Sequence, residues 1–289
     1  MSVRTAVPHP VKTVGRVVSV RVGSATAGRR QLPAFLLVGA QRAGTTSLFR
    51  ALMSHPLVHA ANYHKGVNYF DVNYGRDLAW YRGHFPTTTS LRRSSRGRTG
   101  EPITFEASGY YMFHPCAPER IARDLPEVRI VAMVRDPVER AYSAWKHEHA
   151  RGFETEPFER ALELEDERLV GQEERMLADP TYQSFGHRHH AYVRRGQYAE
   201  QLLRLHRLFS PERVHVIESE LFFTAPEETY AGLLDFLGLA IVFPERFDRW
   251  NGRPSSPMAE LTRLRLRAHF DGHDRALAAL LGRDPAWRS

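Results

Sequence analysis

The chain has 289 residues, of which 42% are hydrophobic and 25% are charged, and these fractions exclude a wholly disordered protein. The longest apolar stretch, residues 33–40, is too short to span a bilayer, and arginines interrupt the apolar residues of the N-terminus, so neither a transmembrane segment nor a signal peptide is expected. The net charge of +7 comes almost entirely from residues 1–33, which excludes a nucleic-acid-binding domain with a basic face of its own.

The first 33 residues carry six basic and no acidic side chains, and we expect them to form a flexible basic tail. Such a tail could touch an anionic membrane surface from the periphery or simply remain solvated. Residues 34–285 are expected to form one domain, which a chain of this length allows. The single cysteine, Cys116, excludes an internal disulfide, so a reducing cytoplasm is the expected location.

Short apolar runs alternate with helical patterns along the chain. The continuous run 35–39 is typical of a strand that is buried on both faces of a parallel sheet. Further strands are predicted at 103–106, 129–134 and 214–217, and helices at 45–53, 117–124, 137–150, 156–178, 198–209, 230–237 and from 261 onward, with a polar basic loop at 87–101. The alternation predicts an α/β fold with a central, mainly parallel sheet flanked by helices.

A glycine-rich loop separates the first predicted strand from the first predicted helix. Its two glycines, Gly39 and Gly44, let the backbone turn and point N–H groups inward, and the helix N-terminus adds partial positive charge. The candidate phosphate-binding residues are Arg42, Ala43, Gly44, Thr45, Thr46 and Ser47. Together they predict a P-loop-like site for a phosphate or a phosphosulfate.

The loop differs from that of the P-loop nucleoside triphosphatases in the place of its cation. In those proteins a lysine directly after the second glycine reaches the outer phosphates. Here Thr45 has that position, and the cation, Arg42, lies inside the loop. An NTPase or kinase is therefore a less favoured alternative.

A second anion-binding pattern follows the predicted strand 129–134. Arg135 stands at the carboxyl end of this strand, where parallel sheets bind ligands, and Ser143 follows about two helical turns later. An arginine fork and a hydroxyl can hold one terminal phosphate from two sides.

The two loops together resemble the sulfotransferases that use 3′-phosphoadenosine 5′-phosphosulfate (PAPS), above all the heparan-sulfate N- and 3-O-sulfotransferase branch and its bacterial relatives. Family loops read G-x-Q-K-x-G-T-T and R-D-P-x-x-R-x-x-S, and this chain reads GAQRAGTT from Gly39 and RDPVERAYS from Arg135. The later segment Asn251-Gly252-Arg253 resembles a family loop that closes over the nucleotide.

The resemblance implies transfer of a sulfuryl group from PAPS to a hydroxyl or amine, with a carbohydrate or glycolipid favoured as the acceptor. It places the 5′-phosphosulfate on the first loop and the 3′-phosphate at Arg135 and Ser143, with Gly252 and Arg253 closing the site. Arg42 has the position of the family's loop lysine, where a cation assists the leaving group.

The resemblance also implies that Lys65 stabilises charge on the transferring group, and the scheme requires no metal ion. His187, His189 and His190 lie close together, but they lack a zinc-binding spacing or a cysteine partner. We expect them to be surface or acceptor-site residues.

The catalytic base is the point at which the chain departs from the family pattern. Relatives read K-E-x-x-F-F, and the glutamate is the usual base, whereas this chain has Gly66 after Lys65. Glu106 or His64 could take the acceptor's proton instead, or the acceptor needs no dedicated base. Because glycine does no acid–base chemistry, a non-catalytic nucleotide- or glycan-binding homologue is a second alternative.

Overall fold

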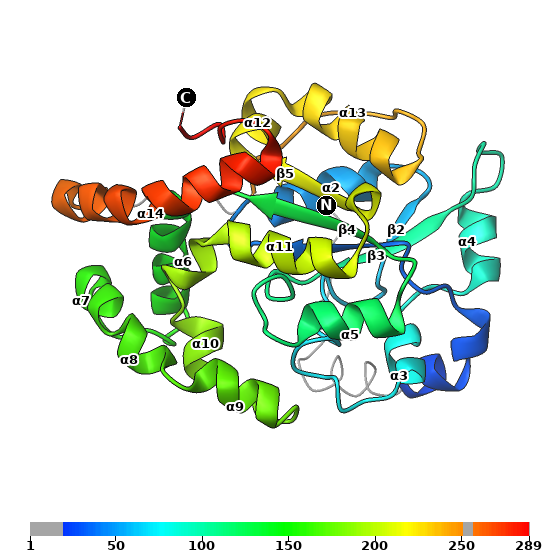
Figure 1. Cartoon of the computed structure of the whole chain (residues 1–289). Helices are drawn as coiled ribbons and strands as arrows, with labels where there is room; N and C mark the ends of the chain where they lie inside the picture. Colours follow the sequence, from blue (N-terminus) through cyan, green and yellow to red (C-terminus); the bar gives the residue numbers. More distant parts are fainter. Residues whose placement is uncertain (1–19, 251–256, 289) are drawn as a thin grey trace, which may run out of the picture.

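A computed structural model of the chain describes residues 20–250 and 257–288. Its centre is one sheet of five strands in the order β2-β3-β1-β4-β5 (Figure 1). The strands are β1 (Phe35–Gly39), β2 (Val58–Ala60), β3 (Ile103–Ala107), β4 (Arg129–Val134) and β5 (Val214–Glu218). Neighbouring strands pair in parallel throughout, which confirms the predicted α/β fold.

Helices cover both faces of the sheet and bury its central strands. On one face α5 (Ala117–Asp124) and α11 (Tyr198–Leu208) lie side by side, and α2 (Thr45–Ser54) and α13 (Pro226–Leu237) cover the other face (Figure 1). All five residues of β1 are buried, as its continuous apolar run predicted. The hydroxyl of Tyr230 on α13 donates to the carbonyl oxygen of Ala51 on α2 at 3.0 Å, which joins the two helices of that layer.

The strand order places a topological switch point between β1 and β4. The chain leaves β1 through α2 toward β2 at one edge of the sheet, whereas it leaves β4 toward β5 at the other edge. Loops that follow two such neighbouring strands diverge, and ligands bind between them. The loops after β1 and β4 are the two that the sequence predicted to hold the nucleotide.

Further helices surround the sheet. The helix α6 (Pro137–Ala150) begins after Asp136, whose carboxylate accepts a hydrogen bond from the Val138 N–H at 2.8 Å, and a proline suits its first turn. Beside α6 lie α7 (Phe158–Glu163), α8 (Glu165–Leu169), α9 (Gln172–Ala178) and α10 (Phe185–His189) (Figure 1). The remaining elements are α3 (Leu78–Arg82), α4 (Thr88–Ser94), α12 (Ser219–Thr224), α14 (Glu260–Leu281) and the 3₁₀ turns η1 (Ala27–Arg29), η2 (Arg194–Gly196) and η3 (Pro211–Arg213).

Two local predictions are wrong. The single helix predicted over 156–178 is three short helices, and Gly171 separates the last two by adopting a left-handed φ of 69°. The loop predicted over 87–101 contains α4, which begins because the Thr87 hydroxyl caps it by accepting from the Ser90 N–H at 3.2 Å.

The N-terminal boundary of the folded region also differs from the prediction. Ala27 is buried, the Arg30 guanidinium donates to the Phe85 carbonyl oxygen at 2.5 Å, and the Arg82 guanidinium donates to the Arg30 carbonyl oxygen at 2.6 Å. The expected flexible tail is therefore wrong for residues 20–33, while residues 1–19 lie outside the described residues. Residues 20–33 are held by polar contacts with residues distant in the sequence, and such contacts cannot be predicted from a local apolar pattern. In the part of the chain that the structure describes, no helix has both the length and the apolarity that a bilayer crossing requires.

Candidate functional site

The loop between β1 and α2 is a tight turn that carries a cation. Arg42 has a φ of 72° and Gly44 a φ of 92°, both in the left-handed region. A Cβ atom at Gly44 would come within 3.1–3.2 Å of side-chain atoms of Met133, Phe223 and Ser219, so glycine is required there. Ala43, between the two, is fully buried. The turn therefore leads directly from Arg42 into the N-terminus of α2.

Lys65 brings a second cation to this helix N-terminus. Its Nζ donates to the Thr45 Oγ1 at 3.0 Å and to the Thr46 Oγ1 at 3.2 Å. Burial lowers the pKa of Lys65 to about 8. A cation, two hydroxyls and the end of a helix dipole thus meet at one place, and this is an arrangement that suits an anionic ligand.

The second loop reaches the first through Arg42. The Arg42 Nε donates to the Ser143 Oγ at 3.0 Å, and the Arg135 Nη1 donates to the Arg42 carbonyl oxygen at 3.2 Å. The fold therefore brings together two motifs that are about 90 residues apart, as the switch point between β1 and β4 requires. The second basic residue of the second motif, Arg140, is fully buried and donates to the Tyr192 carbonyl oxygen, so it ties α6 to a neighbouring segment.

Three predicted nucleotide-binding residues call for separate comment. Gly252 and Arg253 lie outside the described residues. Ser47 is buried, and its hydroxyl accepts a hydrogen bond from the Trp250 N–H at 2.9 Å. The Ser47 hydroxyl thus joins α2 to the chain just before residues 251–256, and this contact differs from the phosphate contact that we expected.

Glu106 does not fit the expectation that it takes a proton from an acceptor. It is fully buried, and its carboxylate accepts hydrogen bonds from the Val67 N–H at 2.5 Å and from the Tyr81 and Tyr111 hydroxyls, each at 2.9 Å. Burial raises the pKa of Glu106 to about 7, against the effect of these donors. The carboxylate holds the segment that carries Lys65, so Glu106 is a positioning residue. His64, the other candidate, is exposed.

The structure gives a steric reason for glycine at position 66. The segment around it pairs with the end of β3, and the Ala107 N–H donates to the Lys65 carbonyl oxygen at 2.8 Å. A Cβ atom at Gly66 would lie 2.6 Å from the Ala107 carbonyl oxygen. A glutamate side chain, which the family pattern has here, therefore requires a shift of the backbone.

Replacing Gly66 by alanine is accordingly expected to lower the free energy of unfolding by about 1–3 kcal/mol, because the contact with the Ala107 carbonyl oxygen forces the two segments apart. Gly75→Ala is the matched control, since a Cβ atom at Gly75 meets nothing within 4 Å. Urea unfolding of both variants measures the difference. Equal stability of the two variants would show that the segment yields without cost.

A small basic cavity adjoins the first loop. It measures about 150 Å³. Its lining residues come from the first loop, the segments after Lys65 and β3, the end of α6, α10 and η2, and they are Gln41, Asn68, Gly109, Tyr110, Arg151, Arg188, His189 and Arg195. The cavity therefore shares Gln41 with the loop that carries Arg42.

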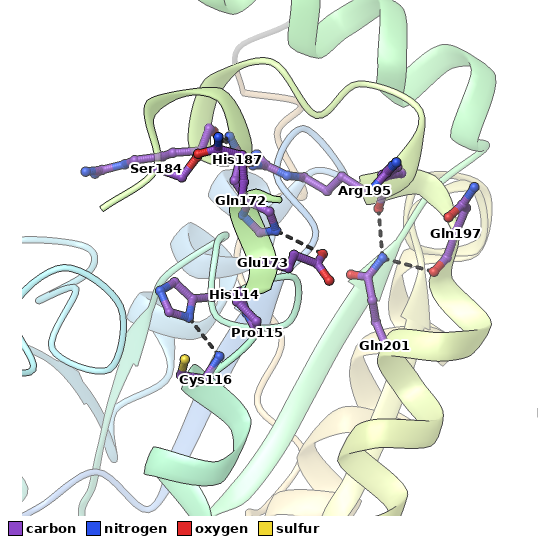
Figure 2. A network of polar contacts seen from close by, with 12 residues as sticks. His114, Pro115, Cys116, Gln172, Glu173, Ser184, His187, Arg195, Gln197 and Gln201 are labelled. Atoms are coloured by element: carbon purple, nitrogen blue, oxygen red, sulfur yellow. Dashed lines mark hydrogen bonds and ion pairs between the residues drawn. The ribbon is translucent and has the colours of Figure 1, made fainter. Parts of the chain in front are cut away.

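The wall of this cavity is held by polar contacts across the α9–α11 region (Figure 2). The Arg195 guanidinium contacts the Gln41 Oε1 and donates to the His187 carbonyl oxygen at 2.9 Å. Figure 2 shows Gln201 of α11 donating hydrogen bonds to the Arg195 and Gln197 carbonyl oxygens. It also shows the hydrogen bond between the Glu173 carboxylate of α9 and the His187 ring. The wall is thus anchored to the loop between β1 and α2 through Gln41.

Of the residues of this wall, the sequence singled out His189 as a surface or acceptor-site residue, but it did not predict the contacts of Gln41, Arg195 and Glu148. Gln41 belongs to the first motif, and its place there was the available signal. Arg195 reaches Gln41 across 154 residues, so no local spacing predicts this contact. Glu148 is a buried acid on α6, and only the folded structure shows its contact with Gln41.

Comparisons with known proteins agree with this arrangement. The profile of a family described as "Sulfotransferase domain" matches residues 32–252. A membrane-associated sulfotransferase (kil1) of Dictyostelium discoideum is 25% identical, with 89% of this chain and 67% of that protein covered. The heparan sulfate glucosamine 3-O-sulfotransferase 6 of Mus musculus is 26% identical, with 90% of this chain and 75% of that protein covered. The crystal structure of a sulfotransferase from Alicyclobacillus acidocaldarius superimposes with a TM-score of 0.64 and 30% identity, over 90% of this chain and all of that one.

Proposed function

The chain belongs to the sulfotransferase domain family, and we propose that it takes the sulfuryl group from PAPS and transfers it to a hydroxyl or amine of a carbohydrate-type acceptor. The observation that carries the donor assignment is the meeting of two anion-binding loops at Arg42. PAPS bears a phosphosulfate on one side of its ribose and a phosphate on the other. Two adjacent cationic groups on neighbouring loops fit this pair of anions.

Each loop has a separate part in the proposed reaction. The N-terminus of α2, with Lys65, Thr45 and Thr46, would hold the 5′-phosphosulfate, and Arg135 with Ser143 would hold the 3′-phosphate. As the acceptor oxygen attacks sulfur, the bond from sulfur to the bridging phosphate oxygen breaks, and negative charge grows on the departing phosphate. Cations fixed at that place before the reaction stabilise the charge without reorganising.

The nature of the acceptor is proposed from the relatives and from the cavity. The Mus musculus relative is named for heparan sulfate glucosamine, which is a sugar acceptor. The cavity beside Gln41 is lined by polar and basic side chains, which suits a polar, hydroxyl-rich group better than an apolar one.

Calorimetric titration tests the donor assignment directly. We expect 3′-phosphoadenosine 5′-phosphate (PAP) to bind with micromolar affinity and ATP with magnesium to show no binding. Binding of ATP alone would favour an NTPase or kinase. Binding of PAP without release of PAP from PAPS would favour the non-catalytic homologue, for which Gly66 is the supporting observation.

A further inference from the structure

We infer that His189 is the base that accepts the acceptor's proton in this chain, with Glu148 as its positioning partner. The inference rests on the proposed function, because it concerns the same transfer. Position 66 has no side chain, and Glu106 is buried beneath the segment that carries Lys65. Where the acceptor needs a base, another wall of the site has to supply it.

The geometry of a histidine–carboxylate pair is present beside the first loop. The His189 Nδ1 lies 2.9 Å from the Glu148 Oε2, and the Glu148 Oε1 accepts from the Gln41 Nε2 at 2.8 Å. Glu148 is 1% exposed and His189 is 11% exposed. A base whose ring is oriented by a buried carboxylate is the arrangement that recurs in activated nucleophilic sites. Here the same carboxylate also connects the ring to the loop that carries Arg42.

The charge of Glu148 sets which ring nitrogen of His189 is available. Burial by itself would raise the pKa of Glu148, but the hydrogen bonds from His189 and Gln41 and the charge of Arg151 outweigh it and lower this pKa. The carboxylate is therefore ionised near neutral pH and favours a proton on the His189 Nδ1. The lone pair of a neutral ring then resides on Nε2, which is the nitrogen that can accept a proton.

The surroundings hold the His189 ring in place and supply positive charge. The rings of Phe153 and Phe185 lie with centroids 4.5 and 4.7 Å from the His189 ring. The cavity that His189 lines is also lined by the titratable residues Tyr110, Arg151, Arg188 and Arg195. Their positive charge would attract an acceptor that carries partial or full negative charge.

Neighbouring histidines do not offer the same chemistry. Both ring nitrogens of His187 are engaged, Nδ1 with the Tyr110 hydroxyl at 2.7 Å and Nε2 with the Glu173 carboxylate at 3.2 Å. The His190 Nε2 bonds to the Phe153 carbonyl oxygen at 2.9 Å. Neither ring lines the cavity, whereas His189 does.

The proposed step balances without any further reagent. The acceptor oxygen forms a bond to sulfur, and the bond between sulfur and the bridging oxygen of PAPS breaks, with its electron pair passing to that oxygen. The acceptor's proton passes to the His189 Nε2, and the charge on the resulting imidazolium is stabilised by the Glu148 carboxylate.

A pair of substitutions separates this role from a structural one. In His189→Asn the side-chain amide can still donate to Glu148 but has no basic nitrogen, and His190→Asn is the matched control on the adjacent residue. PAP formation from PAPS is measured with N-desulfated heparan sulfate as the acceptor and with water alone. We expect His189→Asn to lower the rate about 10²-fold or more and to remove the acidic limb of the rate–pH profile. PAP affinity and Tm should stay near the wild-type values, and His190→Asn should retain its rate within about twofold of the wild type.

The outcomes are distinct. A wild-type rate and an unchanged acidic limb in His189→Asn would overturn the inference while leaving the proposed function in place. If the wild-type protein neither binds PAP nor releases it from PAPS, the donor assignment and this inference are overturned together. The wild-type measurement shows this before any variant is compared. Should His189→Asn unfold, long-range ¹H–¹⁵N NMR of the wild-type histidine rings decides. The proton on Nδ1 supports the assignment, and the proton on Nε2 overturns it.

Discussion

Replacement of Lys65 by methionine is expected to lower the rate of sulfuryl transfer by about 10²–10³-fold, the loss that follows removal of one preorganised charge-stabilising group. The Lys65 ammonium is fixed on the hydroxyls of Thr45 and Thr46, at the N-terminus of α2 where the departing phosphate would gain charge. Methionine has a similar length and removes the charge together with the hydrogen bonds to Thr45 and Thr46. Because burying an ammonium is itself costly, stability should change little. Steady-state kinetics with PAPS and a Tm measurement check both parts.

The pH dependence provides a control for this assignment. Because burial lowers the pKa of Lys65 to about 8, the free enzyme loses the ammonium as the pH rises through that value. The kcat/KM for PAPS should therefore fall above pH 8, about tenfold per pH unit. Lys65→Arg stays charged throughout this range, so it should lack the alkaline limb even if its rate is lower. An alkaline limb that persists in Lys65→Arg would assign it to another group.

The sequence was sufficient for four of the five strands and for the two loops that follow β1 and β4. Short continuous apolar runs such as 35–39 and 129–134 are typical of a strand that is buried on both faces by helices. The strands β1 and β4 have these bounds in the structure. The short elements were harder to predict. The strand β2 has three residues, and the helix α4 depends on a single capping hydroxyl, so neither carries a periodic signal.

The candidate site shows the same difference between residues in local motifs and residues that depend on long-range contacts. Arg42, Thr45, Thr46, Arg135 and Ser143 lie in local motifs, and the fold brings them together as expected. Lys65 contacts the two threonine hydroxyls, and its place beside the transferring group stays a prediction.

The proton acceptor could not be predicted in this way. Glu106 follows the expected spacing, but three hydrogen-bond donors close around its carboxylate. The pairing of His189 with Glu148 joins residues 41 positions apart on two different helices, and no spacing rule relates them. Local motifs predict backbone-defined loops well, whereas side-chain pairs between helices depend on packing.

The 3′-phosphate site gives the second large expected effect. Arg135→Ala should weaken the binding of PAP about 10–100-fold, because it removes a charge-assisted pair of hydrogen bonds to a terminal phosphate. The binding of adenosine 5′-phosphosulfate, which lacks the 3′-phosphate, should change by less than about threefold. The matched control is Arg129→Ala, at the opposite end of β4, where the guanidinium contacts the Leu237 carbonyl oxygen. Calorimetry with both nucleotides on both variants makes the comparison.

The ratio of the two affinities carries the argument, because Arg135 also contacts the Arg42 carbonyl oxygen. If its main role were to support the first loop, Arg135→Ala would disturb the 5′ end, and both nucleotides would lose affinity equally. A selective loss for PAP places the 3′-phosphate at Arg135. Arg135→Lys should recover only part of the PAP affinity, since an ammonium keeps the charge but not the bidentate fork. Full recovery by lysine would mean that charge alone, rather than the geometry after β4, selects the nucleotide.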